Sequence, residues 1–455
     1  MAINSMTRGS IPGQLLRFSL PMVLGNLFQL TYNAVDTIVV GRWVGKNAVA
    51  AVGTANPIMN VVIFFIGGIC MGASVLMAEY YGAEDLRRLK REISTTLLAG
   101  GLFALAMSVL CFFLARPVLL LIHTPPEILD DAAGYLRVIF AGLLFTYLYN
   151  FYSNTLRSIG DSRTPLLFLI LSSLLNIGLD IAFVAGLKMG VRGAAVATVI
   201  SQAVSGLLCI LYIRIRIPLL RFGRGELVLD VSMLTRTVSY SWVTALQQTC
   251  IYVGKLAVQG AVNPLGVDSI AAFNAVARVD DFAITPMQSI GSALTTFTAQ
   301  NHGARSEQRI HRGLACGALL GTGYWALICA PVFFGAGAVM HLFVPTGGQD
   351  VLALGMLYLH RMAFFYLLPA WTNTLQGYFR GRGLLVTTLV SSLLQIGIRV
   401  ICSYALAPTS GIGGIAWACG IGWTAMVLYE LSLYLRDRRR RLRPESAGAP
   451  PAGEK

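Results

Sequence analysis

The chain has 455 residues, of which 55% are hydrophobic and only 12% are charged, and its formal net charge at pH 7 is +14. A soluble globular chain carries roughly 25% charged residues, so this composition excludes an ordinary soluble domain. A net positive charge is also typical of nucleic-acid-binding proteins. The placement of the basic residues along the chain shows whether this explanation is needed.

Twelve apolar segments are each long enough to cross a bilayer, which takes about 20 residues as a helix. In hydrocarbon, backbone polar groups must pair within their own segment, and this requirement favours helices. We therefore predict an all-α integral membrane protein with twelve transmembrane helices, at approximately 14–40, 47–79, 92–115, 132–155, 165–186, 192–213, 235–262, 268–300, 313–340, 352–378, 384–406 and 413–435.

The basic residues gather on one side of the predicted membrane. With the N-terminus inside, 25 of the 35 Lys and Arg residues fall in cytoplasmic segments and 5 on the opposite face. This bias is the positive-inside rule, and it predicts a multi-pass protein with both termini in the cytoplasm. Membrane lipids therefore account for the charge, and we expect no nucleic-acid partner.

The first predicted span carries four polar residues at spacings of three, four and three, which places them on one helix face: Asn26, Gln29, Asn33 and Asp36. Amide side chains often hydrogen-bond between membrane helices, so the first three have a structural explanation. A carboxylate in the bilayer costs at least a few kcal/mol and marks a functional site by default. We therefore assign Asp36 a functional role.

The chain repeats itself. SSLLNIGLD at 172–180 returns as SSLLQIGIR at 391–399, with three differences, and 44–52 and 79–91 match 265–273 and 300–312 at a similar offset. A steady offset predicts a tandem duplication. Each half has six spans, so both enter the membrane in the same orientation, as pseudo-symmetric six-helix lobes of a parallel repeat. We predict an N-lobe at 1–217, a cytoplasmic linker at 218–234, a C-lobe at 235–436 and a basic, disordered cytoplasmic tail at 437–455.

The two copies differ in chemistry where they otherwise agree. Asn176 and Asp180 share a helix face, and the second copy has Gln395 and Arg399 in their places. Asp36 corresponds to an alanine in the second half. The first half therefore has an acidic set that the second half lacks.

The second half has its own intramembrane charges, with Asp280 and Asp281 among Lys255, Arg278 and Arg399. One interpretation is that these charges pair with one another, as intramembrane charges usually do. The other is that an aspartate faces a water-filled cleft and meets a cationic substrate. Both remain open, and the predicted substrate cleft comprises Asn33, Asp280, Asp281, Gln395 and Arg399.

The sequence contains no P-loop, H-E-x-x-H, G-x-S-x-G or G-x-G-x-x-G set in a context that would support it. We therefore expect neither an enzyme with catalytic residues nor an organic cofactor.

Four stretches resemble the multidrug and toxic compound extrusion (MATE) family: VDTIVVGRWVG at 35–45, AEYYGAEDLRR at 78–88, RSIGDSRTP at 157–165 and NIGLDIAF at 176–183. The resemblance covers roughly 14–436. It implies a monomeric transporter of the bacterial inner membrane that exports drug-like, often cationic compounds in exchange for Na⁺ or H⁺ by alternating access.

At the positions of the family's cation site, this sequence has residues of matching type. The resemblance implies that Na⁺ or a proton binds there, at Asp36, Asn176, Asp180 and Thr198. Many members have an acid on the seventh helix, where this chain reads ALQQTC at 245–250, so a second cation site is not expected. An alternative is an exporter or flippase of a lipid-linked or amphipathic metabolite. A cleft dominated by Arg399 and Lys255 would favour it, because such substrates are anionic.

Overall fold

The computed structural model describes residues 5–223, 226–343 and 348–442, without the side chains of residues 32–34, 37, 342–343 and 440–442. Within these ranges the secondary structure is helical, and no strand occurs. The substrate-cleft prediction for Asn33 lies outside the described side chains.

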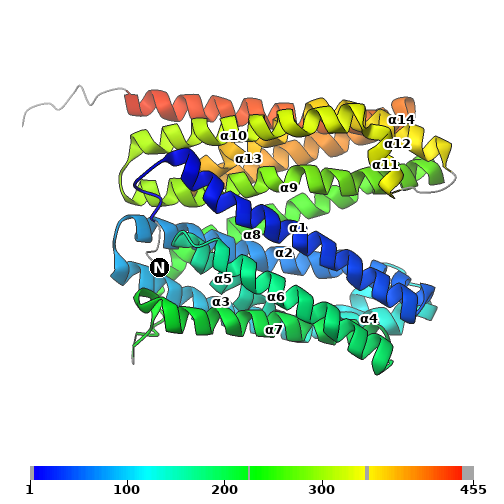
Figure 1. Ribbon diagram of the computed structural model, residues 1–455, viewed down its shortest axis with the longest axis horizontal. Helices are drawn as coiled ribbons and strands as arrows, with labels where there is room; N and C mark the ends of the chain where they lie inside the picture. Colours follow the sequence, from blue (N-terminus) through cyan, green and yellow to red (C-terminus); the bar gives the residue numbers. More distant parts are fainter. Residues whose placement is uncertain (1–4, 224–225, 344–347, 443–455) are drawn as a thin grey trace, which may run out of the picture.

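The first half begins with three long helices and continues through helices that are joined or interrupted (Figure 1): α1 (Ile11–Trp43), α2 (Lys46–Gly82), α3 (Leu86–Leu121), α4 (Pro126–Ala141), α5 (Leu143–Ser158), α6 (Arg163–Asp180), the π-helical η1 (Ile181–Gly186) and α7 (Gly190–Arg216). The second half follows after the short η2 (Pro218–Leu220): α8 (Val231–Val262), η3 (Asn263–Leu265), α9 (Val267–Gly303), α10 (Glu307–Phe334), α11 (Ala336–Phe343), α12 (Gln349–Phe365), α13 (Leu367–Gly381) and α14 (Leu385–Leu442).

The twelve predicted helices are confirmed once the joined helices are taken together. The pairs α4–α5, α6–η1, α10–α11 and α12–α13 each form one predicted span, whereas α14 contains two spans separated at Gly411 (φ 55°, ψ −142°). By length and hydropathy alone, six described helices could cross a membrane, or seven if the bent pair α12–α13 counts as one span. Spans such as α1 fall short by that measure because they carry polar residues, among them Asn26, Gln29 and Asp36.

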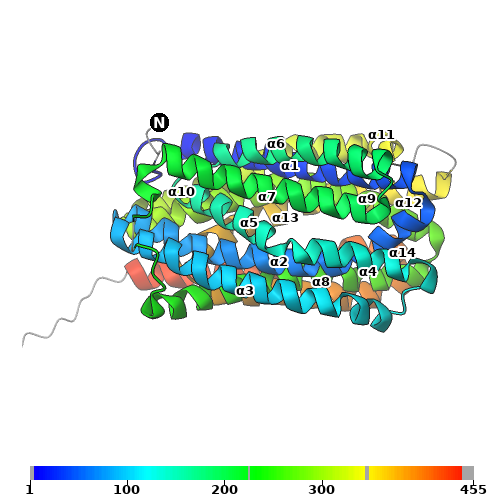
Figure 2. The same ribbon diagram turned by 90° about the horizontal axis from the view of Figure 1, so that it is seen from below.

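The cores of the two halves are largely separate. One buried apolar cluster lies entirely between Val258 and Cys419, and another entirely between Val39 and Ala195. Helix α1 belongs to both halves, because Leu15 and Phe18 near its start pack against Phe297 of the second half. The end of α1 packs in the core of the first half. Both views show all the helices running roughly along the long axis of the bundle (Figure 2).

The halves meet most tightly at the end of the bundle that carries the basic loops. There, a Cβ added to Gly72 or Gly82 of α2 would overlap the backbone of Tyr240 or Gln300, so only glycine permits this approach. Gln300 also joins the halves by hydrogen bonds, donating to the Ser158 carbonyl at 2.8 Å and accepting from the Met6 N–H at 2.8 Å. Gly53, near the other end of α2, has open space around it.

The predicted linker is docked on the first half. Ser94 of α3 accepts the N–H of Val228 at 2.7 Å, and Thr95 accepts the N–H of Asp230 at 3.0 Å. Glu226 forms an ion pair with Lys90 at 2.9 Å. The N–H of Gly223, together with Lys90, holds the pKa of the Glu226 carboxyl below its ordinary value. The connection between the lobes is therefore fixed to α3.

The last helix continues beyond residue 436, where the sequence predicts the tail to begin, and ends at Leu442. Asp437 explains the difference, because its carboxylate accepts the Tyr378 hydroxyl at 2.7 Å and lies 3.7 Å from Arg382. These contacts hold the final turns against α13. Residues 443–455 of the predicted tail lie outside the described residues.

We expect Gly82→Ala to separate the lobes at their basic end, because the added methyl group would overlap the Gln300 carbonyl. The matched control is Gly53→Ala on the same helix, which enters open space. Distances between spin labels placed on the two lobes at this end would measure the effect. A Gly82→Ala distance distribution identical to that of Gly53→Ala would show that the close contact does not hold the lobes together.

Candidate functional site

Two carboxyl groups from different helices meet inside the first half. Asp36 of α1 and Asp180 at the end of α6 lie within hydrogen-bonding reach of each other, and Asp180 is fully buried. Neither Asp180 oxygen has a hydrogen-bond donor among the described residues, and the same holds for Oδ1 of Asp36. Two acceptors that face each other without a donor leave a place for a positive charge or a proton.

Local backbone structure presents Asp180 at this point. Helix α6 ends at Asp180 and passes directly into the π-helical turn η1. Such turns are rare and frequently lie at functional sites. Asn176, one turn earlier on the same face, is also buried, and neither atom of its amide has a partner within the described part of the chain.

Helix α7 carries neutral side-chain oxygens; it packs against α6 and η1, and α1 contacts all three elements. The half-buried Thr198 hydroxyl donates to the Ala194 carbonyl at 3.0 Å, which leaves its oxygen free to accept. Oγ of Ser201 and Oε1 of Gln202 are buried without a partner in the described structure. Gln202 lies one turn after Thr198 on the same face of α7.

The chemistry of this acidic site suits a small hard cation or a proton. Carboxylate and amide oxygens are ligands that hard cations prefer, and the unpartnered amide of Asn176 lies one turn from Asp180 on the same helix face. No group of three His, Cys, Asp or Glu residues in the described ranges is placed to hold a metal ion.

The corresponding place in the second half has the opposite polarity. Arg399 of α14 interacts electrostatically with Asp280 of α9, although no ion pair within 4 Å joins them in the described structure. The Asp280 carboxylate instead accepts the hydroxyls of Tyr358, at 3.1 Å, and Tyr366. Tyr358 was missed in the sequence, where only its spacing of eight residues from Tyr366 could have pointed to it.

The other intramembrane charges of the second half lie nearer the surface. Lys255 and Asp281 form an ion pair at 2.9 Å with side chains about half exposed, at 54% and 46%. Arg278 is exposed. Asp281 is thus paired within the protein, whereas the roles of Asp280, Gln395 and Arg399 in a substrate cleft stay predictions.

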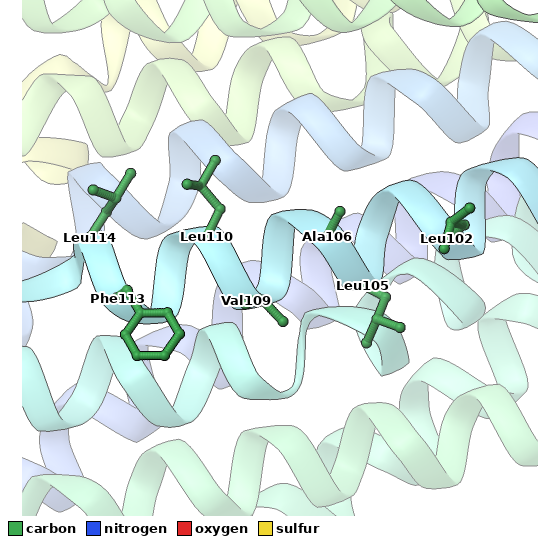
Figure 3. Close-up of a pocket in the computed structure, with 7 residues that line it drawn as sticks. All are labelled: Leu102, Leu105, Ala106, Val109, Leu110, Phe113 and Leu114. Carbon is green, nitrogen blue, oxygen red and sulfur yellow. The ribbon is translucent and has the colours of Figure 1, made fainter.

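A hollow on the described surface lies elsewhere. It has a volume of about 580 Å³, and all its lining residues are apolar side chains of α3 (Figure 3): Leu102, Leu105, Ala106, Val109, Leu110, Phe113 and Leu114. Leu102 and Phe113 are 70% and 68% exposed. Such a face suits contact with lipid tails, and it includes no residue of either polar cluster.

A family model described as MatE matches residues 21–182 and again residues 244–405. The chain belongs to the MatE family. The two matches, one in each half, also confirm the duplication. Among similar proteins, the probable multidrug resistance proteins YpnP and YoeA of Bacillus subtilis are 28% and 29% identical, over 88% and 86% of both chains in each case.

More distant relatives of this MatE protein include one described as an FAD transporter, from Shewanella oneidensis, which is 22% identical and is matched over 93% of this chain and 94% of its own. A solved structure described as the outward-facing conformation of a multidrug resistance MATE family transporter has the same fold, with a TM-score of 0.90 at 22% identity over 96% of this chain and 98% of that one.

We expect Asp180→Asn to abolish stabilisation of the MatE protein by its cation. A cation that binds only the folded wild type at 100 times its Kd adds about 2.7 kcal/mol to its stability. The melting temperature of purified protein, measured with rising Na⁺ and with falling pH, reports this effect. Asp130→Asn, at a carboxylate that is 82% exposed, is the control and should respond like the wild type. An undiminished response of Asp180→Asn would place the cation elsewhere.

Proposed function

We propose that this protein is a secondary active antiporter that exports organic, often cationic compounds in exchange for Na⁺ or H⁺. The observation that carries the proposal is the buried pair Asp36 and Asp180, whose carboxyl groups lie together without a donor. Intramembrane carboxylates of this kind mark ion pathways and proton relays. Membership of the MatE family agrees with transport rather than catalysis.

The coupling would act through α1. A cation bound between Asp36 and Asp180 removes the repulsion between them and allows α1 to pack differently against α6 and η1. Helix α1 also packs against α9 of the second half, so a change in its position alters the contact between the lobes. By thermodynamic linkage, the cation then lowers the affinity for substrate, and substrate lowers the affinity for the cation by the same factor.

The arrangement of the lobes supports alternating access. Their close contact lies at the end that carries the basic loops, which the positive-inside rule assigns to the cytoplasm. We infer an outward-facing monomer in the bacterial inner membrane with both termini in the cytoplasm. To return, the lobes must separate where Gly72 and Gly82 now touch α8 and α9.

Export of an anionic, amphipathic metabolite is the second candidate. The specific observation in its favour is Arg399, a half-buried cation where the first lobe has a carboxylate. The relative described as an FAD transporter also handles an anionic compound. An ion gradient would not be required for simple flipping of such a molecule, which separates the two candidates.

We expect an imposed Na⁺ or H⁺ gradient to drive efflux of a cationic dye from vesicles containing the wild-type protein. Combining Asp36→Asn with Asp180→Asn should reduce the gradient-driven rate at least tenfold, because the coupling carboxylates are gone. Dye fluorescence after the gradient is applied measures the rate. Efflux by the double variant at the wild-type rate would refute the assignment of the coupling site.

A further inference from the structure

The C-lobe contains unpartnered hydrogen-bond donors at the depth where the N-lobe contains unpartnered acceptors. Within the described residues, Nε of Arg399 and Nε2 of Gln395 are buried without a partner. Gln395 is only 8% exposed. We propose that Arg399 and Gln395 form a binding site for the anionic group, a carboxylate or phosphate, of an exported substrate. This inference rests on the proposed transport function.

Arg399 and Gln395 form one surface because they are one helical turn apart on α14. They occupy the positions of Asp180 and Asn176 in the repeat, so they face the interior of their own lobe. Arg399 interacts there with Tyr358 of α12 and Cys419 of the second part of α14. The guanidinium is therefore held among three helices rather than turned toward lipid.

The aspartate nearest to Arg399 does not fill this site. Both oxygens of Asp280 are engaged by hydroxyl donors, Oδ2 by Tyr358 and Oδ1 by Tyr366. No carboxylate lies within 4 Å of the Arg399 guanidinium in the described part of the protein. An ion pair would have satisfied both groups, and the tyrosines instead leave the N–H face of Arg399 available.

The Arg399 guanidinium supplies the positive charge of this site. The Arg361 guanidinium of α12 is separate from it, because it lies beside Gly413 near the outer end of the second part of α14. Guanidinium groups bind carboxylates and phosphates in a fork geometry, and in a region of low dielectric such contacts are strong.

A matched pair of probes tests the site: a rhodamine dye with a free carboxylate and its methyl ester, which differ only in the anionic group. Fluorescence anisotropy with purified protein in detergent gives a Kd for each. We expect the wild type to bind the carboxylate dye about tenfold more tightly than the ester, the effect of one charge-assisted contact. Arg399→Gln should remove this preference and leave the Kd of the ester unchanged.

Two further variants distinguish loss of the anion contact from misfolding of the protein. Arg399→Lys keeps the charge but not the fork, so it should retain part of the preference. Arg278→Gln, which removes an exposed cation from α9 of the same lobe, should retain all of it. Equal binding of both dyes by the wild type, or an equal loss of both by Arg399→Gln, would overturn the proposal. Binding is measured without an ion gradient. If ion-coupled transport fails but the anion site exists, the wild type still prefers the carboxylate dye, so the two failures can be told apart.

The anion could also belong to a lipid headgroup, and one additional arm separates these sources. Added phosphatidylglycerol should not change the Kd of the carboxylate dye if the site serves soluble substrates. Displacement of the dye by the lipid, in the wild type but not in Arg399→Gln, would support the anion site and assign it to a phosphate headgroup. Displacement to the same extent in both proteins would overturn the site.

Discussion

The approach of two carboxyl groups, Asp36 and Asp180, is the interaction on which the first lobe depends. In hydrocarbon a lone carboxylate is costly, and a second one beside it adds repulsion. Three elements nevertheless hold the pair in place: α1, the end of α6 and the π-helical turn that follows. Stability alone would not maintain such an arrangement, because apolar residues of similar size would pack there at lower cost. We therefore propose that the pair is kept because it binds a cation or a proton.

The duplication explains how one fold provides two kinds of site. Both lobes place a side chain at the same point of the repeat, and the N-lobe has Asp180 where the C-lobe has Arg399. Each position projects into the interior of its lobe, where charge is poorly screened. A single difference in side chain therefore reverses the sign of the ligand that the interior can hold. We propose that the second lobe interacts with substrate while the first interacts with the cation.

Much of this arrangement could be predicted from the sequence, because it follows from strong patterns. Apolar length predicts the twelve spans, repetition predicts the two lobes, and a carboxylate in a span identifies Asp36. What could not be predicted depends on rotation and contact. The partners of Asp280 are tyrosines rather than arginines, and the pairing of Lys255 with Asp281 reflects which helix faces meet. Similarly, the last helix extends past its apolar part because Asp437 binds α13.

We propose that cation and substrate compete through the position of one helix, α1. Equilibrium binding of a cationic dye to the purified wild-type protein, titrated against Na⁺ at fixed pH and against pH without Na⁺, tests it most directly. We predict that one of the two cations weakens dye binding about 5- to 150-fold, and that dye weakens binding of that cation by the same factor. A dye affinity that stays constant in both titrations would contradict the account.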